Sequence, residues 1–123
     1  MSHRNKVAIL GASDNPERYS NMLIKRLAGK GHEVFPVNPA LGTIDGIEVY
    51  RSLAELPPGI DVLSVYMNAQ RSTALADAIL ASGIPRVIFN PGAENDALSD
   101  RLSDAGIRVE EACSLVLSGL GHL

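Results

Sequence analysis

The sequence contains few of the residues on which several classes of protein depend. Its single cysteine, Cys113, rules out an internal disulfide framework and a metal site built from clustered thiolates. Only 4% of the residues are aromatic and tryptophan is absent, so the chain offers no platform on which single-stranded nucleic acid would stack. No apolar run has the length that crossing a bilayer requires. The sequence therefore predicts neither a disulfide-stapled fold nor a membrane-spanning one.

The charge and the length of the chain further limit the classes of protein to which it can belong. Eleven basic and fourteen acidic residues give a net charge of −3, which disfavours a broad electrostatic surface for nucleic acid or anionic lipid. The apolar run that follows the charged N-terminal residues is short and is broken by Gly11, unlike a secretory signal. We therefore expect a soluble cytoplasmic protein with a single domain over residues 1–123, which does not partner nucleic acid or membranes.

Strand and helix patterns alternate along the chain. Strands are expected over residues 7–10, 33–37, 61–65, 86–90 and 107–109, and helices over 18–30, 71–81, 94–105 and 112–120. A looser stretch between Pro39 and Gly59, with a short strand at 47–50 and a helical turn near 52–56, is expected at one sheet edge. The alternation predicts an α/β fold: a single Rossmann-like domain whose mostly parallel sheet of five or six strands has helices on both faces.

Apolar residues at helical spacing predict which helix faces are buried. They are Met22, Leu23, Leu27 and Ala28 in the first helix, Leu75, Ala76, Ile79 and Leu80 in the second, and Ala97, Leu98, Leu102 and Ala105 in the third. Gly83 and Gly106 follow two of these helices, where glycine commonly ends a helix in the left-handed conformation.

The turn after the first strand has the composition of a phosphate-binding turn. Gly11 lets the backbone turn without a Cβ clash, Ala12 keeps the approach open, and Ser13 or Asp14 is suited to cap the following helix. Backbone N–H groups at such a turn face an incoming phosphate. Only the first glycine of the three-glycine dinucleotide fingerprint is present, so a capped turn without a ligand stays an alternative.

Three polar residues follow this turn. The guanidinium of Arg18 is suited to hold a diphosphate, and the hydroxyls of Tyr19 and Ser20 are suited to donate hydrogen bonds to its oxygens. The alternatives are a solvated charge for Arg18 and a half-buried packing ring for Tyr19. The adjoining glycine turn favours the ligand-binding interpretation.

The second strand ends in Asn38 and Pro39, where an NAD-binding chain would carry an acidic residue. A carboxylate there accepts hydrogen bonds from the ribose hydroxyls of NAD but repels a ribose that carries a phosphate. The neutral Asn38 is compatible with a phosphorylated ribose. The alternative is structural, because Asn-Pro is a common turn pair.

Taken together, residues 11–21, 35–39, 49–53 and 56–57 resemble the small bacterial CoA-binding domain proteins. These proteins are similar to the nucleotide-binding domain of the succinyl-CoA synthetase alpha subunit. The resemblance spans nearly the whole chain and implies a Rossmann-like fold that binds coenzyme A. It implies that Gly11, Ala12, Ser13 and Arg18 lie near the phosphates and that Asn38 and Pro39 lie near the adenosine end. It also places the exit of the third strand, at Tyr66 and Met67, along the remaining ligand surface.

The sequence departs from this family pattern at several positions. Relatives often carry a lysine directly after the Asn-Pro pair, where this chain has Ala40. They also tend to have an arginine-rich, proline-containing turn after the third strand. This chain has Met67 and Asn68 there, and only Arg71 is placed to substitute; the alternative for Arg71 is a surface charge at a helix start. These departures leave two alternatives open: a different nucleotide as the ligand, or a site that has decayed.

Asn90 lies at the exit of the next strand, on the edge of the sheet expected to face the ligand. Its amide is suited to hydrogen-bond an amide group of the ligand or to order a loop. The alternative is a Pro-Gly turn leading into a capped helix.

No residue has the setting of a catalytic group. The phosphorylated histidine of the synthetase belongs to a second domain, and none of His3, His32 and His122 matches it by position. Glu110 and Glu111 disfavour a thiolate at Cys113, which we interpret as a small core residue. We expect no metal site.

The sequence thus favours a module that binds coenzyme A or acyl-CoA without catalytic machinery of its own. The alternative is a nucleotide-binding subunit of an acyl-CoA ligase-like or nicotinamide-dependent enzyme completed by another chain. The expected protein partners are a ligase-like chain or a second copy of this chain. The apolar run at residues 115–117 is a candidate patch for such a dimer, and the alternative is that it packs in the core.

Overall fold

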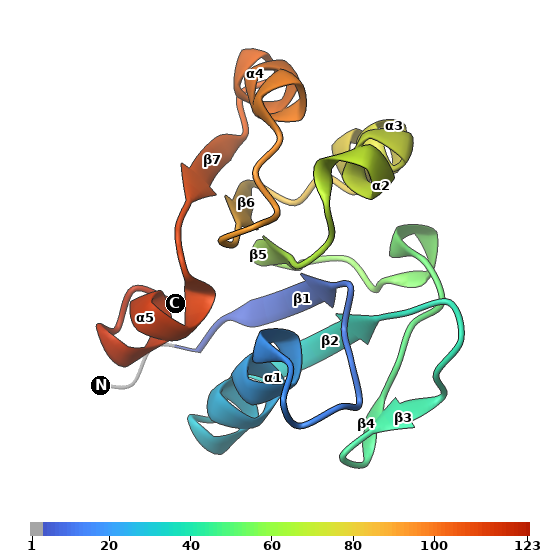
Figure 1. Cartoon of the computed structure of the whole chain (residues 1–123), viewed down its shortest axis with the longest axis vertical. Helices are drawn as coiled ribbons and strands as arrows, with labels where there is room; N and C mark the ends of the chain where they lie inside the picture. The colour runs from blue at the N-terminus through green and yellow to red at the C-terminus, as the bar shows by residue number, and fades with distance from the viewer. Residues whose placement is uncertain (1–3) are drawn as a thin grey trace.

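The computed structural model describes residues 4–123, and its centre is a five-stranded parallel sheet (Figure 1). The strands are β1 (Lys6–Leu10), β2 (Glu33–Val37), β5 (Val62–Val65), β6 (Arg86–Phe89) and β7 (Arg108–Glu111). They lie in the order β2-β1-β5-β6-β7, and every neighbouring pair is parallel. The predicted α/β Rossmann-like class is confirmed.

Helices cover both faces of the sheet. They are α1 (Tyr19–Gly29), α2 (Ala69–Ala74), α3 (Ala76–Ala81), α4 (Asp96–Asp104) and α5 (Ser114–Gly119). Helices α1 and α5 lie on one face, and α2, α3 and α4 lie on the other (Figure 1). Strand β1 serves both layers, because Ala8 and Leu10 point to the α3 side and Val7 and Ile9 point to the α1 side. A central parallel strand is apolar throughout for this reason.

The buried face of α1 differs from the expected one. Leu23, Ile24 and Leu27 are fully buried, whereas Met22 is 38% exposed and Ala28 is exposed. With Ser20, the three buried residues follow the i, i+3, i+4, i+7 spacing of one helical stripe, which passes through Ile24 and leaves Met22 outside. The inclusion of Met22 and Ala28 in the core was therefore wrong.

The single helix expected over residues 71–81 is two short helices that meet at Leu75. Helix α2 begins earlier than expected because the Asn68 side chain accepts a hydrogen bond from the Arg71 N–H at 2.9 Å. In α4 only Leu98 and Leu102 are buried, and the predicted core residues Ala97 and Ala105 are exposed. Small residues at the margin of an apolar stripe are easily assigned to the wrong side of it.

The stretch after β2 folds along the β2 edge of the sheet, as expected. A short hairpin joins β3 (Thr43–Ile44) to β4 (Ile47–Glu48), with Asp45 and Gly46 both at positive φ. Tyr50 then forms an isolated parallel bridge to Val37, and a 3₁₀ turn, η1 (Leu53–Glu55), follows. The bridge brings the segment after Tyr50 to the carboxyl end of β2.

The C-terminal segment packs on the α1 side of the sheet. Leu115 and Leu117 are half-buried against that apolar layer, whereas Val116 is 58% exposed. Cys113 is half-buried and precedes the first residue of α5. The Nδ1 atom of buried His32 accepts a hydrogen bond from the Asn5 N–H at 2.9 Å, and His3 lies outside the described residues. No helix between residues 4 and 123 has the length and apolar character needed to cross a bilayer.

Candidate functional site

A cavity of about 830 Å³ lies at the carboxyl ends of β1, β2 and β5. The chain leaves β1 for β2 on one side and later returns to β5 on the other, so β1 is the point at which the strand order reverses. Open parallel sheets bind their ligands outside the strand ends at this point. The cavity is lined by Leu10, Gly11, Ala12, Ser13, Arg18, Tyr19, Ser20, Val37, Asn38, Pro39, Arg51, Ser52, Leu53, Ala54, Tyr66, Met67, Arg71, Ala74, Leu75 and Ala78.

Gly11 brings the first turn against the end of β5. Its φ is +86°, and a Cβ atom at this position would lie 2.8 Å from the carbonyl oxygen of Tyr66. A side chain is therefore excluded both by backbone conformation and by space. The next residue, Ala12, donates its N–H to the carbonyl of Val37 at 3.2 Å. The turn thus contacts both neighbouring strand ends and forms the floor of the cavity.

Helix α1 begins at Tyr19, one residue after the predicted start, and its N-terminus carries no side-chain cap in the described part of the chain. Arg18 is the N-cap residue, so the expected cap by Ser13 or Asp14 was wrong. The Ser13 hydroxyl instead accepts the Asn15 N–H at 3.0 Å, inside the loop. The first N–H groups of a helix have no partner within the helix, and an uncapped start leaves them available to an anion.

The residues at this helix start face the cavity in different ways. Arg18 and Tyr19 are exposed, with Tyr19 at 69%, whereas Ser20 is buried at 4%. All three line the cavity. The Tyr19 ring is therefore a wall open to solvent and not a half-buried core residue.

The Asn38 side chain is engaged on both sides. Its amide nitrogen donates to the Ala12 carbonyl at 2.9 Å, and its amide oxygen accepts the N–H groups of Ala40 and Leu41 at 2.8 and 3.2 Å. These bonds tie the end of β2 to the first turn and shape the turn after it. Asn38 therefore holds the cavity wall in place and adds no charge to it.

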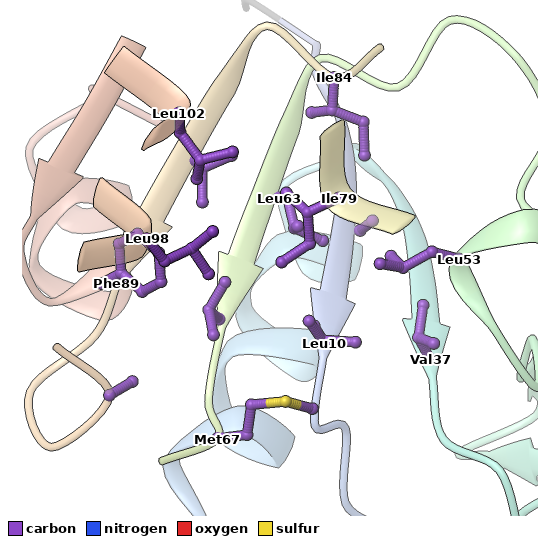
Figure 2. Close-up of a cluster of buried hydrophobic side chains, with 14 of the residues drawn as sticks. Leu10, Val37, Leu53, Leu63, Met67, Ile79, Ile84, Phe89, Leu98 and Leu102 are labelled. Carbon is purple, nitrogen blue, oxygen red and sulfur yellow. The ribbon is translucent and has the colours of Figure 1, made fainter. Parts of the chain in front are cut away.

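Tyr66 and Met67 contribute to opposite layers. Met67 is 9% exposed and packs in the apolar cluster with Leu10 and Leu63 (Figure 2). The Tyr66 ring packs on the α1 side, and its buried hydroxyl makes no hydrogen bond of ordinary geometry in the described part of the chain. Burial raises the pKa of Tyr66 well above its ordinary value, the charge of Cys113 adds to this, and neighbouring serine hydroxyls offset it in part. Tyr66 is thus a neutral phenol at physiological pH.

Asn90 is not among the residues that line the cavity. It is 1% exposed, and its amide nitrogen donates to the Ser64 hydroxyl and the Val65 carbonyl at 2.8 and 2.9 Å. Its amide oxygen accepts the Ser114 N–H at 2.8 Å, and the Ser64 and Ser114 hydroxyls are 2.7 Å apart. This buried network joins β5, β6 and the start of α5, and it uses the Asn90 amide fully inside the protein.

Three arginines line the cavity, and no carboxylate does. Arg18 comes from the start of α1, Arg51 from the segment after Tyr50, and Arg71 from α2. The ion pairs seen among residues 4–123 involve Arg86, Arg101 and Arg108 and none of the three cavity arginines. A chain with a net charge of −3 thus gathers unpaired positive charge at one site, which favours an anionic ligand.

Sequence reasoning missed one wall of this cavity. Residues 51–54 were not predicted as site residues, nor were the small and apolar residues of α2 and α3. Arg71 was recognised only as a substitute for a family arginine, and its surface position fits the alternative as well. Residues 49–53 belong to the family resemblance, but that pattern assigned no role to Arg51; the bridge between Tyr50 and Val37 brings this residue to the site. The residues described contain no group of three metal-ligating side chains that could hold a metal ion.

Several known proteins are similar to this chain. The sequence matches the family described as CoA binding domain over residues 5–119. The uncharacterized protein YneT of Bacillus subtilis (strain 168) is 27% identical over 106 residues, which are 86% of this chain and 78% of that protein. A crystal structure of an uncharacterized protein has a TM-score of 0.92 and 34% identity, and the match covers 99% of this chain and 100% of that one.

A longer protein also contains a related segment. The trans-feruloyl-CoA synthase FCS1 of an unknown prokaryotic organism is 32% identical over 111 residues, which cover 85% of this chain but only 16% of that protein. The family match includes every residue of the five-stranded sheet and of the cavity wall. This chain belongs to the family of CoA-binding domains, as its resemblance to the small CoA-binding proteins indicated.

Proposed function

We propose that this chain binds coenzyme A or an acyl-CoA and has no catalytic machinery of its own. The observation that carries the proposal is the cavity at the reversal of strand order, which three arginines line without any carboxylate. Coenzyme A carries a diphosphate and a separate phosphate on its ribose. Distributed positive charge and an uncapped helix start suit such a ligand better than they suit a neutral metabolite.

The residue at the end of β2 favours coenzyme A over NAD as the ligand. An NAD site offers a carboxylate at this strand end to the free ribose hydroxyls. Asn38 is neutral, and its amide is occupied by the Ala12 carbonyl and by two backbone N–H groups. A phosphorylated ribose meets no negative charge at this wall.

The lining also supports a binding role without chemistry. It contains serine and tyrosine hydroxyls but no histidine, cysteine, lysine or carboxylate, so no neighbouring base in the lining activates those hydroxyls. The proposed role is to sense a CoA thioester or to present it to another protein.

Titration calorimetry of the full chain with coenzyme A, 3′-dephospho-CoA and NADH tests the function. We expect saturable binding of coenzyme A with one site per chain and weak or no binding of NADH. Absence of binding for both coenzyme A and 3′-dephospho-CoA would refute the proposal. Mass spectrometry of a ligand retained through purification would identify the acyl group.

The match to FCS1 supports a second candidate, a CoA-binding part that works with separate ligase domains. In that protein the related segment is 16% of the length, so most of that protein lies outside it. Co-purification of this chain with a larger ligase-like subunit, and catalysis of acyl-CoA formation by the pair alone, would favour this candidate.

A further inference from the structure

We propose that Arg51 is the residue by which this chain selects a ribose that carries a phosphate. The inference rests on the proposed binding of coenzyme A and adds the determinant of its specificity. It assigns a ligand-contacting role to a residue outside the glycine turn and outside the Asn38 turn.

The register of one bridge places Arg51 beside the end of β2. Tyr50 pairs with Val37 in parallel, the Tyr50 N–H donates to the Pro36 carbonyl at 2.8 Å, and the Asn38 N–H donates to the Tyr50 carbonyl at 2.9 Å. One step further along both segments, Arg51 lies next to Asn38. Both residues line the same cavity.

This strand end is where parallel nucleotide-binding sheets read the ribose. A carboxylate there accepts free hydroxyls, and a nearby arginine accommodates a ribose phosphate. Asn38 has no charge and its amide is fully engaged, and Ala40 has no side chain that reaches outward. Arg51 is thus the cation that the fold places at this end of β2.

The backbone that carries Arg51 is anchored on both sides. Val49 is 8% exposed and packs with the apolar layer on the α1 side, whereas Leu53 is 5% exposed and packs with the layer on the other side (Figure 2 labels Leu53). Arg51 itself is exposed, and no ion pair of the described residues involves it. Its guanidinium therefore starts from a fixed base and loses no existing partner when it binds a phosphate.

The other two arginines occupy different walls. Arg18 is the N-cap of α1, next to the glycine turn, and Arg71 lies in the first turn of α2, after β5. These positions suit the diphosphate and the adjoining part of the ligand. Arg71 is consequently a matched control, since it carries the same charge in the same cavity away from the end of β2.

The experiment measures the affinity of the full chain for coenzyme A and for 3′-dephospho-CoA by titration calorimetry at one ionic strength. The proteins are the wild type, Arg51→Gln, Arg51→Lys and Arg71→Gln. We expect the wild type to prefer coenzyme A by about tenfold, the effect of one charge-assisted contact. Arg51→Gln should bind both ligands equally and keep the wild-type affinity for 3′-dephospho-CoA. Arg51→Lys should keep part of the preference, and Arg71→Gln should keep all of it.

Each alternative outcome bears on a distinct claim. Binding of coenzyme A by the wild type with an unchanged preference in Arg51→Gln would overturn the role of Arg51 and leave the proposed function standing. Equal affinity of the wild type for the two ligands would do the same. Loss of the preference in Arg71→Gln alone would move the assignment to Arg71. Failure of the wild type to bind either ligand would overturn the proposed function, and this inference with it.

Discussion

Gly11 occupies the point at which three strand ends meet. The Tyr66 carbonyl at the end of β5 leaves room for the Gly11 backbone but not for a side chain, and the N–H of the next residue, Ala12, bonds the Val37 carbonyl at the end of β2. Gly11 therefore matters to both the fold and the cavity. Its lack of a side chain lets the turn pack against the strand ends and leaves the backbone of the turn accessible to a ligand.

Substitution of Gly11 by alanine should destabilise the protein by about 3 kcal/mol, the sum of a left-handed conformation and a steric overlap. Urea unfolding followed by circular dichroism measures this change. Gly92→Ala is the matched control, because Gly92 has a φ of +89° and nothing within 4 Å of a Cβ. It should cost only about 1 kcal/mol, the conformational part alone. Equal losses in the two variants would show that the contact with Tyr66 is unimportant.

Asn90 lies at a strand exit, but its side chain forms hydrogen bonds with groups in the protein interior. Gly11 and Asn38 lie at strand ends of the same kind and line the cavity, and the Asn-Pro pair that begins at Asn90 repeats the pair that begins at Asn38. Asn90 instead bonds Ser64, Val65 and Ser114, because α5 packs over the end of β6. A polar group buried in this way needs every partner it has.

At the scale of elements, the two edges of the sheet are held by different interactions. The β2 edge is covered by the bridge at Tyr50, which also carries Arg51 to the cavity. The β7 edge is held to β6 by Arg86, whose guanidinium contacts Glu110 at 2.5 and 3.3 Å. The hydrogen bond from Arg86 lowers the pKa of the Glu110 carboxyl below its ordinary value, more than burial raises it.

Stability should therefore depend on pH through Glu110. The folded-state pKa is lower than the unfolded one, so its stabilisation is complete above the unfolded value. It is lost as the pH falls through the folded value. The free energy of unfolding of Glu110→Gln should lie about 1 kcal/mol below that of the wild type at pH 7. The two should converge as the pH is lowered past the ordinary glutamate pKa of about 4.3.

Urea unfolding between pH 7 and pH 3 measures this difference. Glu111→Gln is the control, because Glu111 is exposed on the same strand and takes no part in the ion pairs of the described residues. It should follow the wild type at every pH. A gap between Glu110→Gln and the wild type that stays constant to pH 3 would contradict the assignment.

The boundaries of the helices and strands show which of them the local sequence pattern predicts. Strand β2 was predicted at its observed bounds, Glu33–Val37, because its apolar run ends in the Asn38 turn. The break between α2 and α3 at Leu75 was not predicted, because the residues around it have ordinary helical spacing. The backbone of Leu75, at φ −102° and ψ 7°, departs from the helical conformation that this spacing predicts.

For the whole molecule, the asymmetry of charge follows from topology. The carboxyl ends of β1, β2 and β5 lie on the same side of the sheet. Three segments far apart in the sequence each bring one arginine to these strand ends. The remaining surface contains the excess of acidic residues. Such an arrangement attracts a polyanionic small molecule and disfavours extended anionic partners.

Binding at this site should stabilise the fold by linkage. With coenzyme A at a hundred times its Kd, the free energy of unfolding should rise by about 2.7 kcal/mol. Urea unfolding with and without ligand measures the rise, and NADH at the same concentration is the control. An equal rise with NADH would contradict the proposal that the site prefers coenzyme A, whose ribose carries a phosphate, to a nicotinamide dinucleotide.

The sequence by itself determined the class of the fold and the part of the site that is continuous along the chain. Apolar runs, glycine turns and the residues from Gly11 to Ser20 are local signals, because turn chemistry and strand burial act over a few residues. Tertiary structure alone decided that Arg51 lies beside Asn38 and that Arg71 faces the same cavity. It also decided that Asn90 is used in the core. These outcomes depend on strand order and on one isolated bridge, and no periodicity in the chain encodes which distant segments become neighbours.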